Sequence, residues 1–535
     1  MYVAEDFTAA ETEILRRYFT NLDQPVFALV NLPEVVKGAL FARYSRSNKS
    51  LRRLFLDEFV GELDVSGDLG VDATIGLRRA EELYDRVFFE YGDDSVAQLG
   101  GVHLACEQAS NVLTKVLEWG RLMSYLEQST RYVPYDARLG GRYRYYRDPD
   151  ILGSSLGTRF VADLDGMFES YSAALPVMNE HFRRQFPKAP GDSDFVHRQA
   201  IRAKSFDSVR GMLPAAALSN VGIYGSGQGY ENLLLRMRAH LLPEVRAYAD
   251  MMLSELRKVI PSFLKRLDIE DRGVAWSRYL RATGDAMQAL AHELIEESAE
   301  PFDETPAVRL VDFDPEGEVK LVSSALYSYV DLPEDKLRAR VEKMTPEERL
   351  RVLQTYAGER GNRRHKPGRA LETPCYRFDV LCDYGAFRDL QRHRMLTIEW
   401  QRLAPGHGYS LPEAVEAAGI DGLFTETMAQ SAELHDALVD HFPEQAGYAV
   451  ALAYRIRFVM QMNAREAMHL IELRSSTQGH PAYRHVAQEM HRLIESTAGH
   501  RAIAGMMSFA DRSREPELER LASERRAATR RRSAV

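Results

Sequence analysis

Two short segments of this chain carry many polar and cationic side chains inside otherwise apolar surroundings. The first segment runs from Arg121 to Tyr132. If it is helical, one face presents two guanidinium groups and two hydrogen-bonding groups, from Arg121, Ser124, Gln128 and Arg131. Arginine binds phosphate through a rigid fork of donors, so this face predicts an anion site. A solvated face held by internal ion pairs is the alternative.

The second segment, Gln391 to Arg402, contains the triplet Arg392-His393-Arg394. Three potentially cationic side chains side by side repel one another unless an anion or an acidic partner compensates them. This segment therefore predicts either an anion site or an acidic partner within the protein.

Hydrophobic spacing predicts the elements that position these segments. Apolar residues recur every three or four positions, which is typical of amphipathic helices, over 94–123, 233–267 and 449–473. Short runs predict strands over 27–31, 308–313 and 375–381. The glycine-rich stretch Tyr224 to Tyr230 lacks the spacing of a phosphate-binding motif and is predicted to be a flexible loop.

A weak internal repeat indicates a duplicated fold. The segment Leu117 to Ser124 matches Leu390 to Thr397 at an offset of 273 residues, which places Arg121 on Arg394. A Pro-rich acidic stretch separates the two copies. We therefore predict a first copy over 1–297, a linker over 298–319, a second copy over 320–523 and a basic, disordered tail over 524–535.

Composition excludes several classes of protein. A net charge of −9 over 535 residues does not suit a general nucleic-acid binder. Three cysteines without a CxxC pair argue against a disulfide framework. No signal pattern or long apolar run is present, so we expect a cytoplasmic protein without a membrane span. His485, Glu489 and His491 lack a zinc-binding spacing, so we predict no metal site.

The two polar segments together resemble the signature of the flavin-dependent thymidylate synthases. That signature reads Arg-His-Arg, two residues, Ser, one residue, Asn-Glu, one residue, Ser, one residue, Arg-Tyr. The second copy supplies its beginning with Arg392, His393, Arg394 and Thr397, and the first copy supplies the rest with Arg121, Ser124, Glu127, Ser129, Arg131 and Tyr132. Each copy lacks the other half: Trp119 and Gly120 stand where Arg-His would be, and Glu399 and Trp400 replace Asn-Glu.

Two further stretches resemble the same family. Asn463 to Arg474 is similar to its Asn-x-Arg, apolar helix, Leu-Arg element. Ala487-Gln488-Glu489 follows after an apparent insertion, and His365 and Glu372 are similar to the histidine and glutamate that precede the signature. In the first copy, Asp93, Ser95 and Gln98 occupy that region, and Arg210 opens a short Arg-x-x-Leu-Pro match.

The resemblance implies an α+β, predominantly helical fold with two tandem domains, each having a small antiparallel sheet and long helices. It implies reductive methylation of dUMP to dTMP, with FAD as cofactor and methylenetetrahydrofolate and NADPH as co-substrates. Arg474 would polarise the uracil ring. The flavin would contact Arg392, His393, Asn463, Arg465 and His469, and the nucleotide would contact Gln391, Arg394 and Thr397.

The resemblance also implies a homodimer that imitates the family's tetramer, with no nucleic-acid or membrane partner. The remaining predicted substrate-binding residues, which would complete the wall of a composite site, are Arg121, Ser124, Glu127, Ser129 and Arg131. Two alternatives stay open: a degenerate paralogue that binds flavin or nucleotide without turnover, and a helical scaffold without a cofactor.

Overall fold

The chain forms two compact units, each assembled from three segments. In this computed structural model the described residues are 2–32, 40–41, 44, 47–58, 101–190, 192–295, 307–513 and 521. Unit 1 comprises Met1–Ser172, Leu213–Pro301 and Gln430–Ala449, and unit 2 comprises Ala173–Met212, Phe302–Ala429 and Val450–Val535. Each unit thus contains one segment from the other half of the sequence, so the compact units differ from the continuous ranges predicted above.

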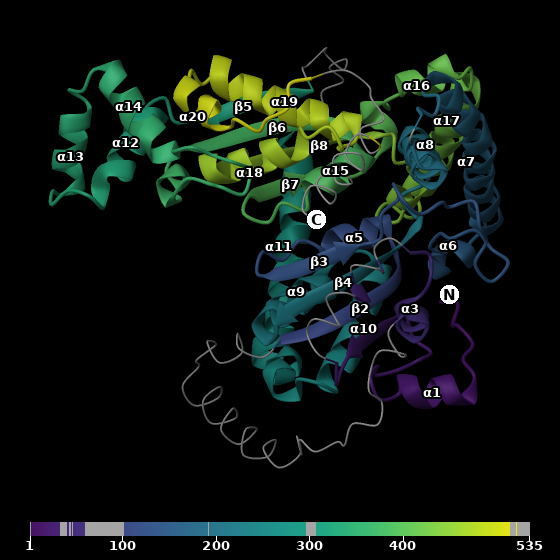
Figure 1. Cartoon of the computed structure of the whole chain (residues 1–535). Helices are drawn as coiled ribbons and strands as arrows, with labels where there is room; N and C mark the ends of the chain where they lie inside the picture. The colour runs from purple at the N-terminus through teal and green to yellow at the C-terminus, as the bar shows by residue number, and fades with distance from the viewer. Residues whose placement is uncertain are drawn as a thin grey trace. The chain divides into compact units, whose positions relative to one another are not determined.

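Unit 1 contains a four-stranded antiparallel sheet (Figure 1). Its strands are β1 (Val26–Leu29), β2 (Gly101–Ser110), β3 (Met123–Glu127) and β4 (Leu218–Ser226), in the order β1-β2-β4-β3. Its helices are α1 (Ala9–Leu15), α3 (Leu51–Glu58), α5 (Asn111–Leu117), α6 (Pro149–Leu152), α9 (Gly227–Ala239), α10 (Pro243–Arg257), η3 (Pro261–Asp268), η4 (Glu270–Val274), α11 (Ala275–Leu294) and η7 (Ala446–Ala449). Helix α10 contacts β1, β2 and α9.

Unit 2 contains a second sheet with the same topology. Its strands are β5 (Val308–Phe313), β6 (Cys375–Asp383), β7 (Thr397–Trp400) and β8 (Arg455–Asn463), in the order β5-β6-β8-β7. Its helices are α8 (Asp194–Val209), η2 (Arg210–Met212), α12 (Gly317–Tyr327), α13 (Glu334–Val341), α14 (Pro346–Ala357), η5 (Arg369–Glu372), α15 (Tyr384–Leu390), η6 (Pro405–His407), α16 (Glu413–Ala417), α18 (Ala464–Arg474), α19 (Pro481–Ser496) and α20 (Arg501–Met506). The boundary between units falls within α7 (Gly157–Gln185) and α17 (Asp421–Val439).

Equivalent helix caps follow equivalent strands in the two sheets. Ser110 ends β2 and accepts a hydrogen bond from the Leu113 amide, while Asp383 ends β6 and accepts one from the Ala386 amide. Such side-chain caps satisfy amide donors that have no partner within the helix, which fixes where a helix begins. The matching strand order and caps confirm the predicted tandem α+β fold with small antiparallel sheets.

The strand predictions for 27–31, 308–313 and 375–381 are confirmed by β1, β5 and β6. In β6 the side chains of Tyr376, Phe378 and Val380 alternate into the core, as a half-buried strand requires. Strand β5 also occupies part of the predicted linker. The tail 524–535 lies outside the described residues.

Several predicted helices are wrong. Residues 101–110 and 455–463 form the central strands β2 and β8, and the segment Arg121 to Tyr132 contains strand β3. The shared helical face proposed for that segment therefore does not exist. The predicted loop Tyr224 to Tyr230 instead ends β4 and begins α9, where Ser226 caps the helix by accepting from the Gly229 amide at 3.2 Å.

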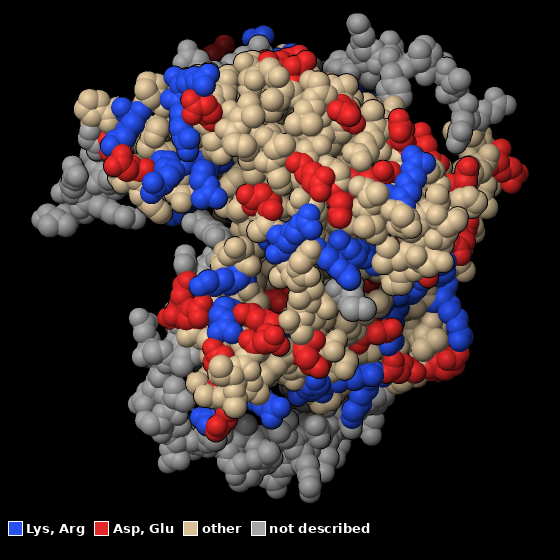
Figure 2. Space-filling view, turned by 90° about the vertical axis from the view of Figure 1, so that its right-hand side faces the viewer, with Lys and Arg blue, Asp and Glu red and all other residues tan. Residues whose placement is uncertain are grey.

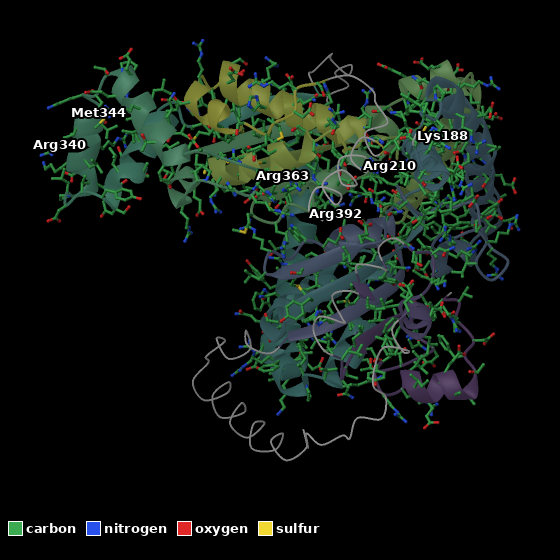
Figure 3. The ribbon with its side chains drawn as sticks, viewed as in Figure 1. Lys188, Arg210, Arg340, Met344, Arg363 and Arg392 are labelled. Atoms are coloured by element: carbon green, nitrogen blue, oxygen red, sulfur yellow. The ribbon has the colours of Figure 1, made fainter. Side chains whose placement is uncertain are left out.

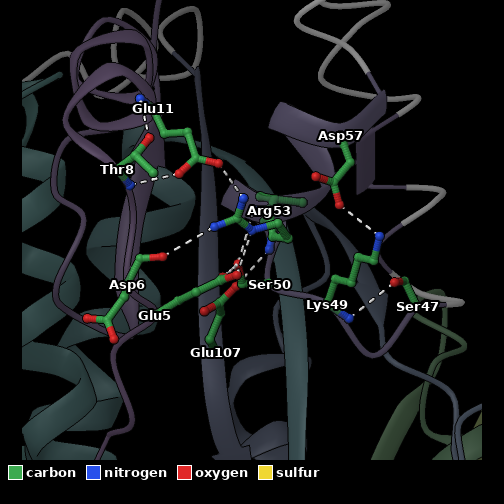
Figure 4. Close-up of polar contacts among 11 residues, drawn as sticks. Glu5, Asp6, Thr8, Glu11, Ser47, Lys49, Ser50, Arg53, Asp57 and Glu107 are labelled. Atoms are coloured by element: carbon green, nitrogen blue, oxygen red, sulfur yellow. Dashed lines mark hydrogen bonds and ion pairs between the residues drawn. The ribbon is translucent and has the colours of Figure 1, made fainter.

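Ion pairs hold the amino-terminal segment of unit 1 (Figure 4). Arg53 on α3 donates to Glu5 at 2.8 Å, to Glu11 at 2.6 Å and to the Asp6 carbonyl at 3.3 Å. On the face shown in Figure 2, basic and acidic side chains are interspersed over the described residues. Within those residues, no helix combines the length and apolar content that crossing a membrane would require.

Candidate functional site

The candidate site lies in unit 2, where the loop after α15 meets helix α18. Asn463 caps α18 by accepting from the Glu466 amide at 2.9 Å, so the helix begins at Ala464. The helix then carries Glu466, His469 and Arg474, and the loop supplies His393. We call these four residues the histidine cluster. Helix and loop therefore bring together residues from the two motifs of the second copy.

A chain of hydrogen bonds fixes the orientation and the tautomer of His393. Its Nε2 accepts from Arg474 Nε at 3.0 Å, and its Nδ1 lies 2.8 Å from Glu466 Oε1. Because arginine stays protonated, Nε2 has to be the acceptor, so Nδ1 carries the proton and donates to Glu466. His393 is thus a neutral link that holds the Arg474 guanidinium in place.

The pKa values agree with a neutral His393. Burial, reinforced by Arg474 and Lys366, holds the pKa of His393 well below its usual value. Burial also lowers the pKa of His469 to about 4 and raises the pKa of Glu466. In a low-dielectric site, removal from water disfavours the charged form of each group. Both imidazoles are therefore neutral at physiological pH.

Three arginines surround one carboxylate beside this cluster. Asp389 lies 3.6 Å from Arg210, 3.6 Å from Arg392 and 3.9 Å from Arg474. Figure 3 labels Arg210 and Arg392 among the side chains of unit 2. Arg210 is buried, and its Nη2 has no hydrogen-bond partner within the described part of the chain. The Asp383 carboxylate also acts on Arg210, so two acidic side chains lie beside these three guanidinium groups. We call Arg210, Arg392 and Arg474 the arginine group.

Lys366 and a buried ion pair border the same region. Burial lowers the pKa of Lys366, whose charge acts on Glu466, Glu472 and both cluster histidines. Arg360 donates to both carboxylate oxygens of Glu472, each at 2.6 Å. Because Glu472 lies on α18, this pair ties the helix to the segment before η5. The pair supports the site rather than contributing to its charge.

The cluster offers metal-ligating groups, but its hydrogen bonds argue against coordination. Ligand atoms of His393, Glu466 and His469 all lie within 4.8 Å of one another. Both ring nitrogens of His393 already have partners, and a divalent cation would have to displace Arg474 and the Glu466 hydrogen bond. Lys366 and Arg474 would also repel it. The arrangement suits anions better than cations.

The other predicted residues of the second copy lie around this cluster with different exposure. Gln391 is buried, Arg394 and Thr397 are exposed, and Asn463 serves as the cap of α18. Arg465 contacts the Pro367 carbonyl at 3.5 Å and lies 3.9 Å from Glu372. His365, by contrast, is exposed and contacts Asn362.

The predicted residues of the first copy lie in unit 1. Arg121 and Ser124 are exposed, Ser129 and Arg131 are half-buried, and Glu127 is buried 3.5 Å from Lys115. Lys115 also pairs with Glu118 at 2.6 Å, so Glu127 belongs to a structural ion-pair group. The composite site that would join these residues to the Arg-His-Arg triplet stays a prediction. Asp93, Ser95 and Gln98 lie outside the described residues.

The equivalent positions in unit 1 lack the histidine cluster. Counting from the helix caps Ser226 and Asn463, the residues matching Glu466, His469 and Arg474 are Gly229, Asn232 and Met237. Gly120 stands in place of His393. The chain therefore carries this constellation in one of its two copies.

Sequence reasoning missed three residues of the site, which are Asp389, Glu466 and Lys366. It also missed that Arg210 lies in unit 2. Glu466 and His469 at i and i+3 on a helix carry a detectable signal, since that spacing puts both on one face. Nothing in the local sequence indicates that Arg210, from the first half, joins Asp389 of the second half. His491, which lacks a zinc-binding spacing, is buried on α19, and its Nε2 donates to the Ala504 carbonyl at 3.1 Å.

We expect acidification to destabilise unit 2. A histidine with a lowered folded-state pKa binds its proton more readily in the unfolded chain, so folding loses stability as pH falls below the unfolded value of about 6.5. His393 and His469 both contribute in this direction, and Glu466 offsets part of the loss, because its raised pKa makes the folded chain bind that proton more readily. Calorimetry should show a melting midpoint several degrees lower at about pH 5 than at about pH 7.5, and His469→Asn should reduce that difference. An unchanged midpoint across this range would contradict the prediction.

Comparisons with known proteins identify the family. The profile of the thymidylate synthase complementing proteins matches residues 42–262 and 309–498, one match in each copy. The chain therefore belongs to the thymidylate synthase complementing protein family. The two matches agree with the duplication inferred from the sheets.

Relatives extend over most of the chain. A UPF0159 protein from Chlamydia muridarum (strain MoPn / Nigg) is 40% identical over 526 residues, covering 97% of this chain and 98% of that protein. A UPF0159 protein from Thermoplasma acidophilum is 31% identical, covering 91% of this chain and 97% of that protein. A flavin-dependent thymidylate synthase from Clostridium tetani is 23% identical over 181 residues, covering 34% of this chain and 67% of that protein.

Proposed function

We propose that this protein is a flavin-dependent thymidylate synthase, which converts dUMP to dTMP with methylenetetrahydrofolate as the one-carbon donor and NADPH as the reductant. The observation that carries the proposal is the orientation of Arg474 by a neutral histidine. A guanidinium fixed before substrate arrives can stabilise charge that develops on a pyrimidine ring, without reorganising during the reaction. Family membership supports the same reaction class.

The described residues fit a flavin dinucleotide, because its pyrophosphate is anionic and the arginine group offers three guanidinium groups, which are strong donors to phosphate oxygens. Arg210 adds a buried Nη2 donor without a hydrogen-bond partner among those residues. In this proposal Arg392, His393, Asn463, Arg465 and His469 hold FAD, which supplies hydride transfer when bound. Asn463 and His393 also keep α18 and Arg474 in position.

The nucleotide contacts follow from exposure and charge. Arg394 and Thr397 are exposed near the cluster, and Gln391 lies in the same loop, so we assign them to the dUMP phosphate and its surroundings. Arginine suits phosphate because its planar fork donates two parallel hydrogen bonds. Arg474 would contact the uracil oxygen, where a fixed cation has its largest effect on the transition state.

A retired paralogue that binds flavin or nucleotide without turnover is the second candidate. Unit 1 favours this candidate, because it has no equivalent of the histidine cluster. The matching positions are Gly120, Gly229, Asn232 and Met237, so each chain carries the cluster once, although its fold is duplicated. Asp389 also offsets part of the arginine charge.

Two measurements on the full chain separate the candidates. A flavin absorbance band in the purified protein, or one restored by adding FAD, is expected for the enzyme and for a paralogue that still binds flavin. Rescue of a thymidine-requiring bacterium is expected for the enzyme alone. Arg474→Ala should abolish that rescue, while Arg338→Ala, at a half-buried residue of α13, should retain it. Protein that stays colourless with added FAD would overturn the enzyme and the flavin-binding paralogue, and would leave only a paralogue that binds nucleotide. Coloured protein without rescue would select the paralogue.

A further inference from the structure

The segment of unit 2 that precedes η5 has a strongly basic sequence. From Glu359 to Arg369 it contains five lysine or arginine side chains and one acidic side chain. Two of the basic side chains have acidic partners, since Arg360 pairs with Glu472 and Arg369 pairs with Glu372. The segment therefore carries more positive charge than its ion pairs neutralise. We call residues 361–366 the basic loop.

Hydrogen bonds fix the backbone of the basic loop. The Gly361 amide donates to His365 Nδ1 at 3.2 Å, and the Arg364 amide donates to Asn362 Oδ1 at 2.9 Å. Arg360 Nε donates to the His365 carbonyl at 2.6 Å, and the same guanidinium forms the buried pair with α18. The loop is thus held in one conformation before a ligand arrives, so binding orders little additional backbone.

Arg363 and Arg364 are the exposed cations of the basic loop. Within the described residues, neither guanidinium has an ion-pair partner. Beside burial, the charge of Arg363 contributes to the lowered pKa of His469, so the loop borders the histidine cluster. Figure 3 labels Arg363 in unit 2, together with Arg392 of the arginine group. Two such guanidinium groups at the border of an anion site can bind a further anionic group.

The proposed reaction brings several anionic molecules to this site. The flavin pyrophosphate is assigned to the arginine group and the dUMP phosphate to Arg394, whereas the glutamyl carboxylates of methylenetetrahydrofolate have no assigned cation. Folates carry a tail of γ-linked glutamates, and each added glutamate brings one further carboxylate. Exposed cations on a loop suit such a flexible, multiply charged tail, because carboxylates can pair with them without entering a closed pocket.

We propose that the basic loop binds the oligo-γ-glutamyl tail of the folate co-substrate through Arg363 and Arg364. Because this tail belongs to a substrate of the proposed reaction, the assignment rests on the proposed function. Each exposed pair of an arginine and a carboxylate contributes little affinity, but several pairs act together. The half-buried Lys366 ends the loop, and its charge acts on both cluster histidines, so positive charge continues from Arg363 to the cluster.

Two other anionic ligands are less suitable for the basic loop. A single-stranded nucleic acid gains much of its affinity from bases that stack on aromatic side chains, and the loop contains no Phe, Tyr or Trp. The 2′-phosphate of NADPH is one compact group, which is bound best by donors that converge on it. Arg363 and Arg364 are instead consecutive and exposed. Binding of RNA or NADPH through this loop is therefore an outcome that opposes the proposal.

Anaerobic titration calorimetry of the full chain, supplied with FAD and dUMP, tests this assignment with tetrahydrofolate monoglutamate and pentaglutamate as ligands. The pentaglutamate should bind about tenfold more tightly, and about 0.5 M salt should remove most of that difference. Arg363→Glu combined with Arg364→Glu should lower pentaglutamate affinity to the monoglutamate level and change monoglutamate affinity less than about threefold. Arg363→Lys combined with Arg364→Lys should keep the preference, because the positive charges remain.

A matched control reverses two exposed charges elsewhere in unit 2. Arg340→Glu combined with Lys343→Glu changes the end of α13, where Figure 3 shows Arg340 well away from Arg363, and should keep the preference for the pentaglutamate. If the native chain binds both folates equally, the loop does not hold the tail, while the proposed function stands. If neither folate binds, both fail. A glutamate variant at 363 and 364 that keeps the preference, or that loses affinity for NADPH or an oligouridylate instead, would also overturn the assignment.

Discussion

Replacing Arg474 with alanine is expected to lower the turnover number for dTMP formation by about 10²- to 10³-fold, the loss typical of removing one preorganised donor from a charge-stabilising site. The side chain is held by the His393 imidazole at 3.0 Å and lies 3.9 Å from Asp389. It therefore occupies a fixed place before any substrate binds. The measurement is dTMP formation by purified, flavin-loaded protein at saturating dUMP.

Two controls separate a catalytic effect from a folding defect. Loss of Arg474 leaves His393 Nε2 without its donor, which costs about 1 to 3 kcal/mol, so circular dichroism should still show a folded chain at room temperature. Arg338→Ala removes a half-buried arginine that pairs with Glu316 at 2.6 Å and should leave turnover unchanged. If Arg474→Ala retains native turnover, Arg474 does not polarise the substrate.

Arg360→Ala is expected to produce the largest loss of stability in unit 2. Arg360 and Glu472 are 4% and 1% exposed, and their two 2.6 Å contacts form a buried bidentate pair. Removing one partner of a buried pair leaves an uncompensated charge and costs about 3 to 5 kcal/mol. For a unit of this size, each kcal/mol lowers the melting midpoint by about 2 to 4 °C. Calorimetry should therefore show a fall of roughly ten degrees.

A double variant tests whether the unpaired charge causes that loss. Arg360→Met combined with Glu472→Leu removes both charges and keeps apolar volume, so much of the lost stability should return. Arg338→Ala, which breaks an exposed pair, should change the free energy of unfolding by about 1 kcal/mol or less. A single Arg360→Ala variant that melts within about two degrees of the native protein would show that the pair contributes little.

Local sequence predicted elements well where a single periodicity was present. Tyr376, Phe378 and Val380 alternate unambiguously, and β6 forms there. Between Gly101 and Ser110 both periodicities are present, because Val102, Leu104 and Cys106 alternate while Val102, Ala105 and Ala109 fit a helix. Pairing with β1 and β4 on both sides selected the strand, and a bulge between Cys106 and Ala109 interrupts the register. Neither neighbour is visible from the local pattern.

The candidate site likewise has one part that the sequence predicted and another part that it did not. The Arg-His-Arg triplet was predicted from residue type, since clustered cations need an anion or an acidic partner, and Arg474 was predicted from the resemblance to a known family. Asp389 lies only three residues before Arg392. It becomes a neighbour of Arg474, and Glu466 becomes a neighbour of His393, only when α15 and α18 pack in one unit. The helical face proposed for Arg121 to Tyr132 failed because β3 pairs with β4 along that stretch.

The sequence by itself determined the duplication through an internal repeat, and the class of fold and the cations of the candidate site through motifs that resemble a known family, because repeats and motif spacing are properties of the chain read in order. Only the tertiary structure decided the tautomer of His393, the burial of Arg360 with Glu472 and the placement of Arg210 beside Asp389. Each of these depends on which distant groups share a low-dielectric environment. Hydrogen bonds and pKa values follow from that environment, and residue order alone does not specify it.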